Sequence, residues 1–198
     1  LIVCTGIINA YNFMDGINGI TGGYSLIILG ALAYINAEMV TFFEPALIYT
    51  VLCSVVVFCF FNFRRKAKCF AGDVGSVSIA FILLFLIGKL ILKTEDFSWI
   101  ILLAVYGVDS VLTIIHRLML HENIGLPHRK HMYQLMANEL KIPHVVVSLA
   151  YMVVQAIVII GYIYCQNWGY LYLLCAILLL SFIYIWFMRK YFSLHLSV

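Results

Sequence analysis

Two short polar segments interrupt a chain that is otherwise apolar, and both carry residues that can do chemistry. The first reads NAYNFMDGING over residues 9–19, and the second reads AGDVGS over residues 71–76. A bilayer tolerates carboxylates and irregular backbone only at its surfaces or around a shielded site. We therefore expect these two segments to carry the function and most of the remaining chain to support them.

The first segment places amide oxygens and a carboxylate close together. Asn9 and Asn12 are three residues apart on the expected last turn of a helix, so they share a face, and Asp15 extends that face. Asp-Gly and Asn-Gly pairs then favour turns before the next helix. The alternative is an ordinary polar turn between two membrane spans.

The second segment centres on Asp73, which is flanked by glycines and precedes a helix that we expect to begin near Ser76. Glycines let the backbone approach a ligand closely, and the amides of a helix start favour an anion. Asp73 would offer Mg²⁺ a hard oxygen ligand, while substrate phosphates and water complete the shell. The basic residues 64–68, Lys68 among them, suit a nucleotide diphosphate or, alternatively, only anionic lipid headgroups.

Five of the six histidines lie in a third polar stretch, residues 116–144, whose densest part is PHRKH at residues 127–131. Arg129 offers planar bidentate donors, and His131 offers a neutral or charged donor near pH 7, so both fit a diphosphate. One alternative is a zinc site, although a nearby Cys or acidic partner at a familiar spacing is missing. The other is a solvated basic loop.

The composition is that of a polytopic membrane protein: 65% of the 198 residues are hydrophobic, 11% are charged, and the mean hydropathy is +1.06. Residues 1–8 look like the end of one span. We expect an all-α, polytopic transmembrane helical bundle in a single domain, residues 1–198, which forms the C-terminal portion of a longer protein. Six further stretches approach the length of about 20 residues that crosses a bilayer: residues 20–37, 46–61, 77–92, 98–115, 144–165 and 169–188.

Basic residues set the expected orientation, because Lys and Arg in short connections stay on the cytoplasmic side. If the loop at residues 9–19 is cytoplasmic, ten of the twelve basic residues lie on that side, and only Lys89 and Lys93 lie at the other end. All three polar stretches then lie at the cytoplasmic face of the plasma (inner) membrane, where they can build one site.

Asp109 lies inside a predicted span, six residues before its cytoplasmic end at residue 115. An unpaired charge near the middle of a bilayer costs roughly 2.5–3.5 kcal/mol on insertion scales, so we expect a partner. Arg117, two turns further along the same face, is the expected partner. Asp109 is then either half of a structural ion pair or a support for the site.

Four motifs in order resemble those of the polyprenyl-phosphate N-acetylhexosamine-1-phosphate transferases. That family includes the bacterial undecaprenyl-phosphate GlcNAc-1-phosphate transferases and the phospho-MurNAc-pentapeptide translocases. The resemblance covers about residues 1–144. The motifs are residues 9–19, residues 70–76, Asp109-Ser110 with IHRL at residues 115–118, and residues 127–131.

The resemblance implies that a membrane polyprenyl phosphate, such as undecaprenyl phosphate, attacks the β-phosphorus of a UDP-linked amino sugar and releases UMP. It implies Mg²⁺ as the cofactor, or Mn²⁺ in its place. By position, Asp73 and Asn12 would bind the metal, and Asp15 would act beside them as a third catalytic residue. The substrate-binding positions would be Asn9, Asn18 (facing the uracil ring), Lys68, Arg129 and His131.

Two departures from the family pattern affect these expectations. Tyr133 stands where the family has a further histidine, and this variant resembles relatives that act in surface-polysaccharide synthesis. The sugar is therefore open among GlcNAc, FucNAc and QuiNAc. The family's adjacent aspartate pair would lie upstream of residue 9 and is absent from these residues, so we expect the chain alone to be inactive.

Two other classes of function are left open. A membrane transporter would place charged or amide residues near span centres, and a non-catalytic assembly subunit would need no site at all. The expected partners are a UDP-amino sugar, polyprenyl phosphate and membrane lipid, with a homodimer left open. We expect no nucleic acid partner.

Overall fold

The computed structural model describes residues 2–123 and 129–196, and within this part of the chain every regular element is a helix. The helices at the N-terminal side are α1 (Ile2–Phe13), α2 (Ile20–Tyr34) with its π-helical extension η1 (Ile35–Met39), α3 (Pro45–Asn62) and α4 (Gly72–Thr94). They are followed by η2 (Phe97–Leu103), α5 (Ala104–Met119), α6 (Met132–Asn138), α7 (His144–Tyr164), η3 (Gln166–Trp168) and α8 (Gly169–Leu196).

Six helical segments of the described chain are long and apolar enough to cross a membrane, so the protein is a multi-pass membrane protein. This confirms the predicted all-α bundle, and residues 2–8 belong to a further helix, α1. The shift that matters most for the second polar segment is at α4, which begins at Gly72 and not near Ser76. Hydropathy places a helix start at the first apolar run, whereas the backbone turns into α4 at a glycine, so Asp73 lies in the first helical turn.

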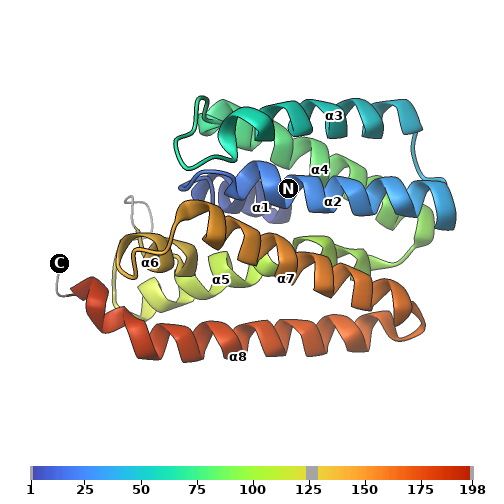
Figure 1. The fold of residues 1–198 in the computed structure, drawn as a ribbon. Helices are drawn as coiled ribbons and strands as arrows, with labels where there is room; N and C mark the ends of the chain where they lie inside the picture. The colour runs from blue at the N-terminus through green and yellow to red at the C-terminus, as the bar shows by residue number, and fades with distance from the viewer. Residues whose placement is uncertain (1, 124–128, 197–198) are drawn as a thin grey trace.

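The helix α2 lies between α3 and α7 in the bundle (Figure 1). Glycines on α2 permit this close packing: a Cβ atom on Gly22 would lie 2.7 Å from the Cys59 Sγ of α3, and one on Gly23 would lie 2.5 Å from the Met152 Sδ of α7. Small residues are the usual means by which membrane helices approach each other. The helix that follows the first polar segment is therefore held on both sides.

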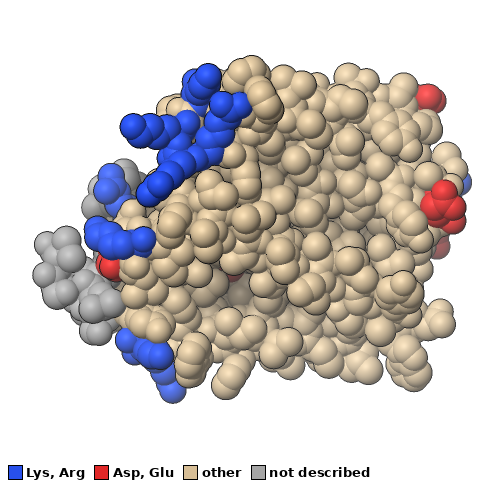
Figure 2. Space-filling view, viewed as in Figure 1, with Lys and Arg blue, Asp and Glu red and all other residues tan. Residues whose placement is uncertain are grey.

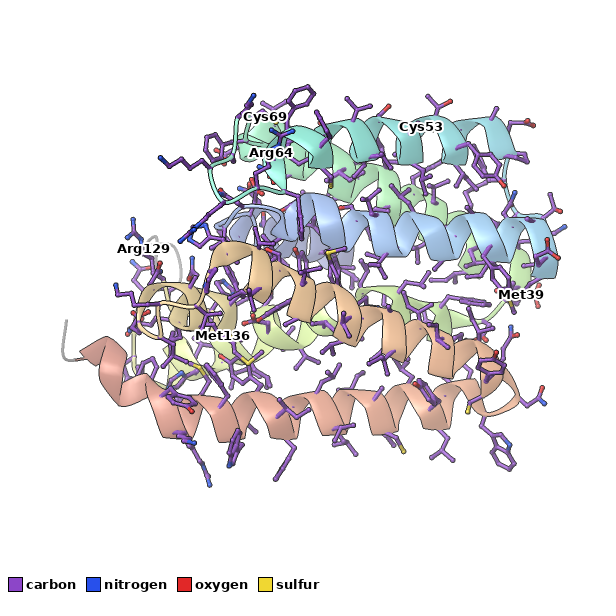
Figure 3. All side chains as sticks on the ribbon, viewed as in Figure 1. Met39, Cys53, Arg64, Cys69, Arg129 and Met136 are labelled. Carbon is purple, nitrogen blue, oxygen red and sulfur yellow. The ribbon has the colours of Figure 1, made fainter. Side chains whose placement is uncertain are left out.

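Connections that carry the predicted motifs all lie at one end of the bundle, which we call the motif end. It comprises the loops at residues 14–19 and 63–71 together with residues 129–143. Figure 2 shows that Lys and Arg side chains gather at this end, while Asp and Glu gather mainly at the opposite end. Figure 3 labels Arg64, Cys69 and Arg129 at the motif end and Met39 at the other.

A buried amide within the bundle stabilises the junction between η2 and α5. Gln155 Oε1 accepts hydrogen bonds from the Tyr24 hydroxyl at 2.6 Å and from the Val105 N–H at 3.1 Å, and its Nε2 donates to the Ile101 carbonyl at 3.0 Å. A change from 3-10 to α-helix leaves backbone groups without their regular partners, and hydrocarbon offers them none. The polar side chain of Gln155 is thereby fully used in supporting the fold.

Candidate active site

The first polar segment leaves its helix before Asp15. Helix α1 ends at Phe13, and the backbone N–H of Asp15 donates to the Asn12 carbonyl at 3.2 Å in the turn that follows. The prediction that Asn9 and Asn12 lie on a helix is confirmed. The prediction that Asp15 extends their helical face is wrong, because the chain turns at Met14, whose side chain is fully buried.

The end of α1 and the start of α4 meet through Asn12 and Ser76. The Ser76 hydroxyl is buried and lies 2.6 Å from Asn12 Oδ1, and it also lies 2.9 Å from the Gly72 carbonyl of its own helix. Ser76 is one turn after Asp73, so the contact brings the first and second polar segments together. Sequence reasoning treated Ser76 only as the start of a helix.

Asp15 and Asp73 lie close enough for their charges to interact. Burial raises the pKa of Asp15, and the negative charge of Asp73 raises it further, while a hydrogen bond with the Gly72 backbone opposes the rise. Asp73 itself is exposed in the first turn of α4. Gly72 has φ +59, a left-handed conformation that favours glycine, and this turn carries Asp73 to the motif end. The two carboxylates therefore lie near each other at the α1–α4 contact.

This donor set fits Mg²⁺. Within residues 2–123 and 129–196, no group of three or more His, Cys, Asp and Glu side chains forms a cage for a metal ion. Mg²⁺ needs no such cage, because it usually takes one or two carboxylates and fills the other positions with phosphate oxygens and water. A cation near Asp15 and Asp73 would also relieve the repulsion between their charges.

Asn18 holds several segments together at the motif end. Its side-chain Nδ2 donates to the carbonyls of Arg64 at 3.1 Å and Arg65 at 3.4 Å. Its backbone N–H donates to His144 Nδ1 at 3.4 Å, and its carbonyl accepts from the Ser148 hydroxyl at 2.9 Å. The amide NH₂ of Asn18 thus positions the basic loop, a role that sequence reasoning missed.

Asn62 is a second residue that the sequence did not single out. It is buried at the end of α3, where its Oδ1 accepts from the Gly19 N–H and its Nδ2 donates to the Cys69 carbonyl, both at 2.8 Å. Gly19 has φ +86, so its conformation also requires glycine. The only available signal was a lone amide at the end of an apolar run.

Three of the predicted substrate-binding residues lie on the surface. Asn9 is exposed on α1, one turn before Asn12, and Lys68 and Arg129 are exposed at the motif end, as Figure 3 shows for Arg129. In the described part of the chain, none of the three side chains has a hydrogen bond to Asn12, Asp15 or Asp73. Pro127 and His128 of the histidine motif lie outside the described residues.

His131 lies beneath the surface, with 1% of its area exposed, and its Nδ1 is 3.3 Å from Asp109 Oδ1. The prediction that Arg117 pairs with Asp109 is therefore wrong. Arg117 Nε bonds Glu122 Oε2 at 3.1 Å, because the side chain turns toward the segment that leaves α5. A hydrogen bond from Lys130 and the Arg117 contact hold the pKa of Glu122 below its usual range.

Tyr133 connects the histidine segment to the first polar segment. It is fully buried, its hydroxyl donates to the Phe13 carbonyl at 2.8 Å, and its ring stacks on His131 with 5.8 Å between centroids. The negative charges of Asp109 and Asp15 both add to the rise that burial causes in the pKa of Tyr133. The side chain thus lies near both carboxylates, and the three polar segments meet at one end of the bundle.

Comparison with known proteins agrees with this arrangement. Residues 1–91 match the model of glycosyl transferase family 4, and curated proteins named as transferases are similar to longer stretches of the chain. A probable undecaprenyl-phosphate N-acetylglucosaminyl 1-phosphate transferase of Bacillus subtilis is 32% identical over 133 residues, 65% of this chain and 37% of that protein. Residues 1–91 of the chain are thus similar to glycosyl transferase family 4.

Two other curated relatives are similar over shorter ranges. A phospho-N-acetylmuramoyl-pentapeptide-transferase of Lactobacillus acidophilus is 35% identical over 74 residues, 37% of this chain and 23% of that protein. A decaprenyl-phosphate N-acetylglucosaminephosphotransferase of Mycobacterium leprae is 36% identical over 91 residues, 42% of this chain and 23% of that protein. The chain thus spans well under half the length of these family 4 relatives.

The range of the family 4 match separates the site into two parts. Asn12, Asp15 and Asp73 lie within residues 1–91, whereas His131 and Tyr133 lie beyond them. The oxygen-donor group therefore belongs to the matched segment. The histidine segment is joined to it by contacts that only the folded chain reveals.

Proposed function

We propose that this protein transfers an N-acetylhexosamine-1-phosphate from a UDP-sugar to a membrane polyprenyl phosphate. A phosphate oxygen of the lipid attacks the β-phosphorus of the UDP-sugar, the bond from that phosphorus to the bridging oxygen breaks, and UMP leaves with that oxygen. The product is a polyprenyl diphosphate that carries the sugar and starts a lipid-linked glycan. The names of the family 4 relatives support this reaction class.

One observation carries the proposal: Asn12, Asp15 and Asp73 come together from two segments at the end of a membrane bundle where Lys and Arg gather. Both substrates are anions, and one of them arrives from the bilayer while the other is water-soluble. Phosphoryl transfer to a preformed anionic nucleophile requires charge neutralisation and in-line positioning more than a strong base. A polar site at the membrane boundary supplies both.

Asp73 and Asn12 would hold Mg²⁺, or Mn²⁺, with Asp15 beside them. Bound there, the ion would neutralise charge on the phosphates of both substrates. The chain's own residues do the positioning. The Ser76 hydroxyl fixes the amide of Asn12 against α4, and the Asn18 amide fixes the basic loop by its carbonyls, so that Lys68 is presented at the same end.

Arg129 and the exposed basic residues would bind the diphosphate from the open side of the site. The motif end would then face the cytoplasm at the plasma membrane, since that is where basic loops are retained and where UDP-sugars are available. A transporter is not favoured. Gln155, an amide within the spans, bonds Tyr24, Val105 and Ile101 and so supports the fold.

The test is a radiolabel transfer assay on the full-length protein with undecaprenyl phosphate and a panel of UDP-GlcNAc, UDP-FucNAc and UDP-QuiNAc. We expect one of these sugars to be transferred in a metal-dependent way. Asp73→Asn should lower the rate by about 100-fold or more while the protein remains folded. Glu44→Gln, which changes an exposed carboxylate at the opposite end, is the matched control and should leave the rate unchanged.

Two results would contradict the proposal. One is transfer by Asp73→Asn at the wild-type rate. The other is UDP-sugar affinity that does not change when Mg²⁺ is titrated. Either result would show that Asn12, Asp15 and Asp73 take no part in the reaction and that the motif end has only a structural role.

A further inference from the structure

The described chain contains a second carboxylate site beneath the motif end, centred on Asp109 of α5. Asp109 is 2% exposed. Its Oδ1 lies 3.3 Å from His131 Nδ1, 3.1 Å from the Met132 N–H and 3.2 Å from the Thr113 hydroxyl. Its Oδ2 accepts from the Tyr151 hydroxyl at 2.6 Å. These partners come from three helices, α5, α6 and α7, and from the residue that precedes α6.

The directions of these bonds follow from the number of protons on each group. Thr113 has one hydroxyl proton and donates it to Asp109, so the Tyr184 hydroxyl, 2.8 Å away, must donate to Thr113. Met132 and Tyr151 can only donate to the carboxylate as well. An ionised carboxylate accepts from four donors without needing any proton of its own. His131 Nδ1 is the fourth neighbour of the carboxylate, and it donates to Oδ1 when the ring carries its proton on Nδ1.

Two of the four residues that bond Asp109 lie at the point where the loop enters α6. His131 is the residue before the helix, and Met132 is its first residue. The His131 backbone N–H also donates to Gln134 Oε1 at 3.3 Å, which fixes the start of the helix further. Tyr133, the next residue, bonds the Phe13 carbonyl. Three consecutive residues are thus fixed to two different parts of the bundle.

We propose that Asp109 is a positioning residue that fixes His131 in the Nδ1–H form and thereby sets how Arg129, two residues earlier, is presented to the diphosphate of the UDP-sugar. This inference rests on the proposed function. Arg129 is exposed and has no bond to Asp109 among the described residues, so an effect of Asp109 on nucleotide binding must pass through His131 and the backbone. In the proposed site, the histidine segment binds the UDP-sugar and does not bind the polyprenyl phosphate.

The kinetic test uses the full-length protein with undecaprenyl phosphate and whichever UDP-sugar the panel selects. We expect Asp109→Asn to raise the KM for the UDP-sugar about tenfold and to change the KM for undecaprenyl phosphate less than about twofold. In the Arg129→Ala background, Asp109→Asn should add less than about twofold, because the residue that it positions is already gone. Equal losses for both substrates, or losses that simply multiply, would overturn the inference.

Asp96→Asn is the matched control. Asp96 lies at the opposite end, where it accepts from the Ser98 N–H at 2.8 Å, the Ser98 hydroxyl at 2.6 Å and the Tyr162 hydroxyl at 3.3 Å. The Asp96→Asn variant loses a comparable set of hydrogen bonds, and it should change neither the KM for the UDP-sugar nor the KM for undecaprenyl phosphate. Thr113→Val removes one donor to Asp109 and keeps the side-chain shape, so it covers the case in which Asp109→Asn does not fold. It should raise the UDP-sugar KM about threefold, and an unchanged KM would count against the inference.

A spectroscopic readout separates this inference from the proposed function. In ¹⁵N-histidine NMR spectra of the full-length protein, assigned with His131→Asn, the wild type should show His131 protonated at Nδ1. Asp109→Asn should shift that signal toward the other form, whereas Asp96→Asn should not. An unshifted signal overturns the positioning role even if transfer is observed, and a shifted signal in a protein without transfer activity supports the role while the proposed function fails.

Discussion

The contact between Gly16 and Tyr133 offers the sharpest test of how the motif end is assembled. A Cβ atom on Gly16 would lie 2.2 Å from the Tyr133 hydroxyl oxygen and 3.0 Å from two carbons of its ring. Tyr133 is fully buried, and its hydroxyl lies 2.8 Å from the Phe13 carbonyl. In Gly16→Ala the ring must therefore move away, and the hydrogen bond that joins α6 to the end of α1 is lost.

The expected cost has three contributions. Overpacking of a filled site costs about 1–3 kcal/mol, and loss of a buried hydrogen bond costs about 0.5–1.5 kcal/mol. Gly16 is not among the glycines with positive φ, so alanine can adopt its backbone conformation. The smaller conformational entropy of the unfolded alanine chain then offsets about 0.4–1 kcal/mol of the cost. We therefore expect Gly16→Ala to lower the free energy of unfolding by about 0.5–4 kcal/mol.

The assay is denaturant unfolding of the full-length protein in detergent micelles, measured for Gly16→Ala, Tyr133→Phe and the double variant. Tyr133→Phe removes the atom nearest to the new Cβ, so Gly16→Ala should cost at least about 1 kcal/mol less in that background. Gly30→Ala is the control, because a Cβ atom there meets nothing within 4 Å. An equal cost of Gly16→Ala with and without the hydroxyl would refute the reasoning.

Three more predictions test other contacts of the motif end. Asn62→Ala should lower the free energy of unfolding by about 2–3 kcal/mol, because it leaves the Gly19 N–H and the Cys69 carbonyl without their partner; unfolding in micelles measures it. Arg129→Ala should raise the KM for the UDP-sugar by the equivalent of about 1.5–3 kcal/mol. An unchanged KM would show that Arg129 is an ordinary solvated residue of the loop and does not bind the substrate. Glu122→Gln should reduce stability at pH 7 by less than about 1 kcal/mol, since the pair with Lys130 is near the surface. The folded-state pKa of Glu122 is lowered, so this difference should be present above the ordinary glutamate pKa and disappear as the pH falls through the lowered value, in melting curves recorded against pH.

Hydropathy was sufficient for the spans, because a helix that crosses hydrocarbon must satisfy its backbone internally and show apolar side chains around most of its surface. It was less accurate where a helix begins in polar sequence. Helix α4 begins at Gly72, within the polar segment, and Asp15 lies in a turn after α1. Both differences arise from backbone geometry at glycine-bearing turns, which hydropathy does not describe.

Side-chain partners were the least predictable feature. Helical spacing suggested Arg117 as the partner of Asp109, because it considers only residues on the same helix. The observed partners are His131, 22 residues further on, and Tyr151, 42 residues further on. Asn62 and Gln155 were missed for the same reason, since each satisfies backbone groups of a segment that is distant in the sequence.

Tyr133 gives a structural meaning to the departure from the family pattern. Its hydroxyl, at the far end of the ring, is the atom that reaches the Phe13 carbonyl, and the absence of a side chain at Gly16 leaves room for it. A histidine at this position is shorter and has no atom at the place of the hydroxyl, so it would leave this carbonyl without the Tyr133 hydrogen bond. The difference therefore changes how the histidine segment is joined to the end of α1, while the Asn12 and Ser76 contact remains as it is. We therefore expect any effect of Tyr133 on the choice of sugar to act through the placement of His131 and of the turn that carries Asp15.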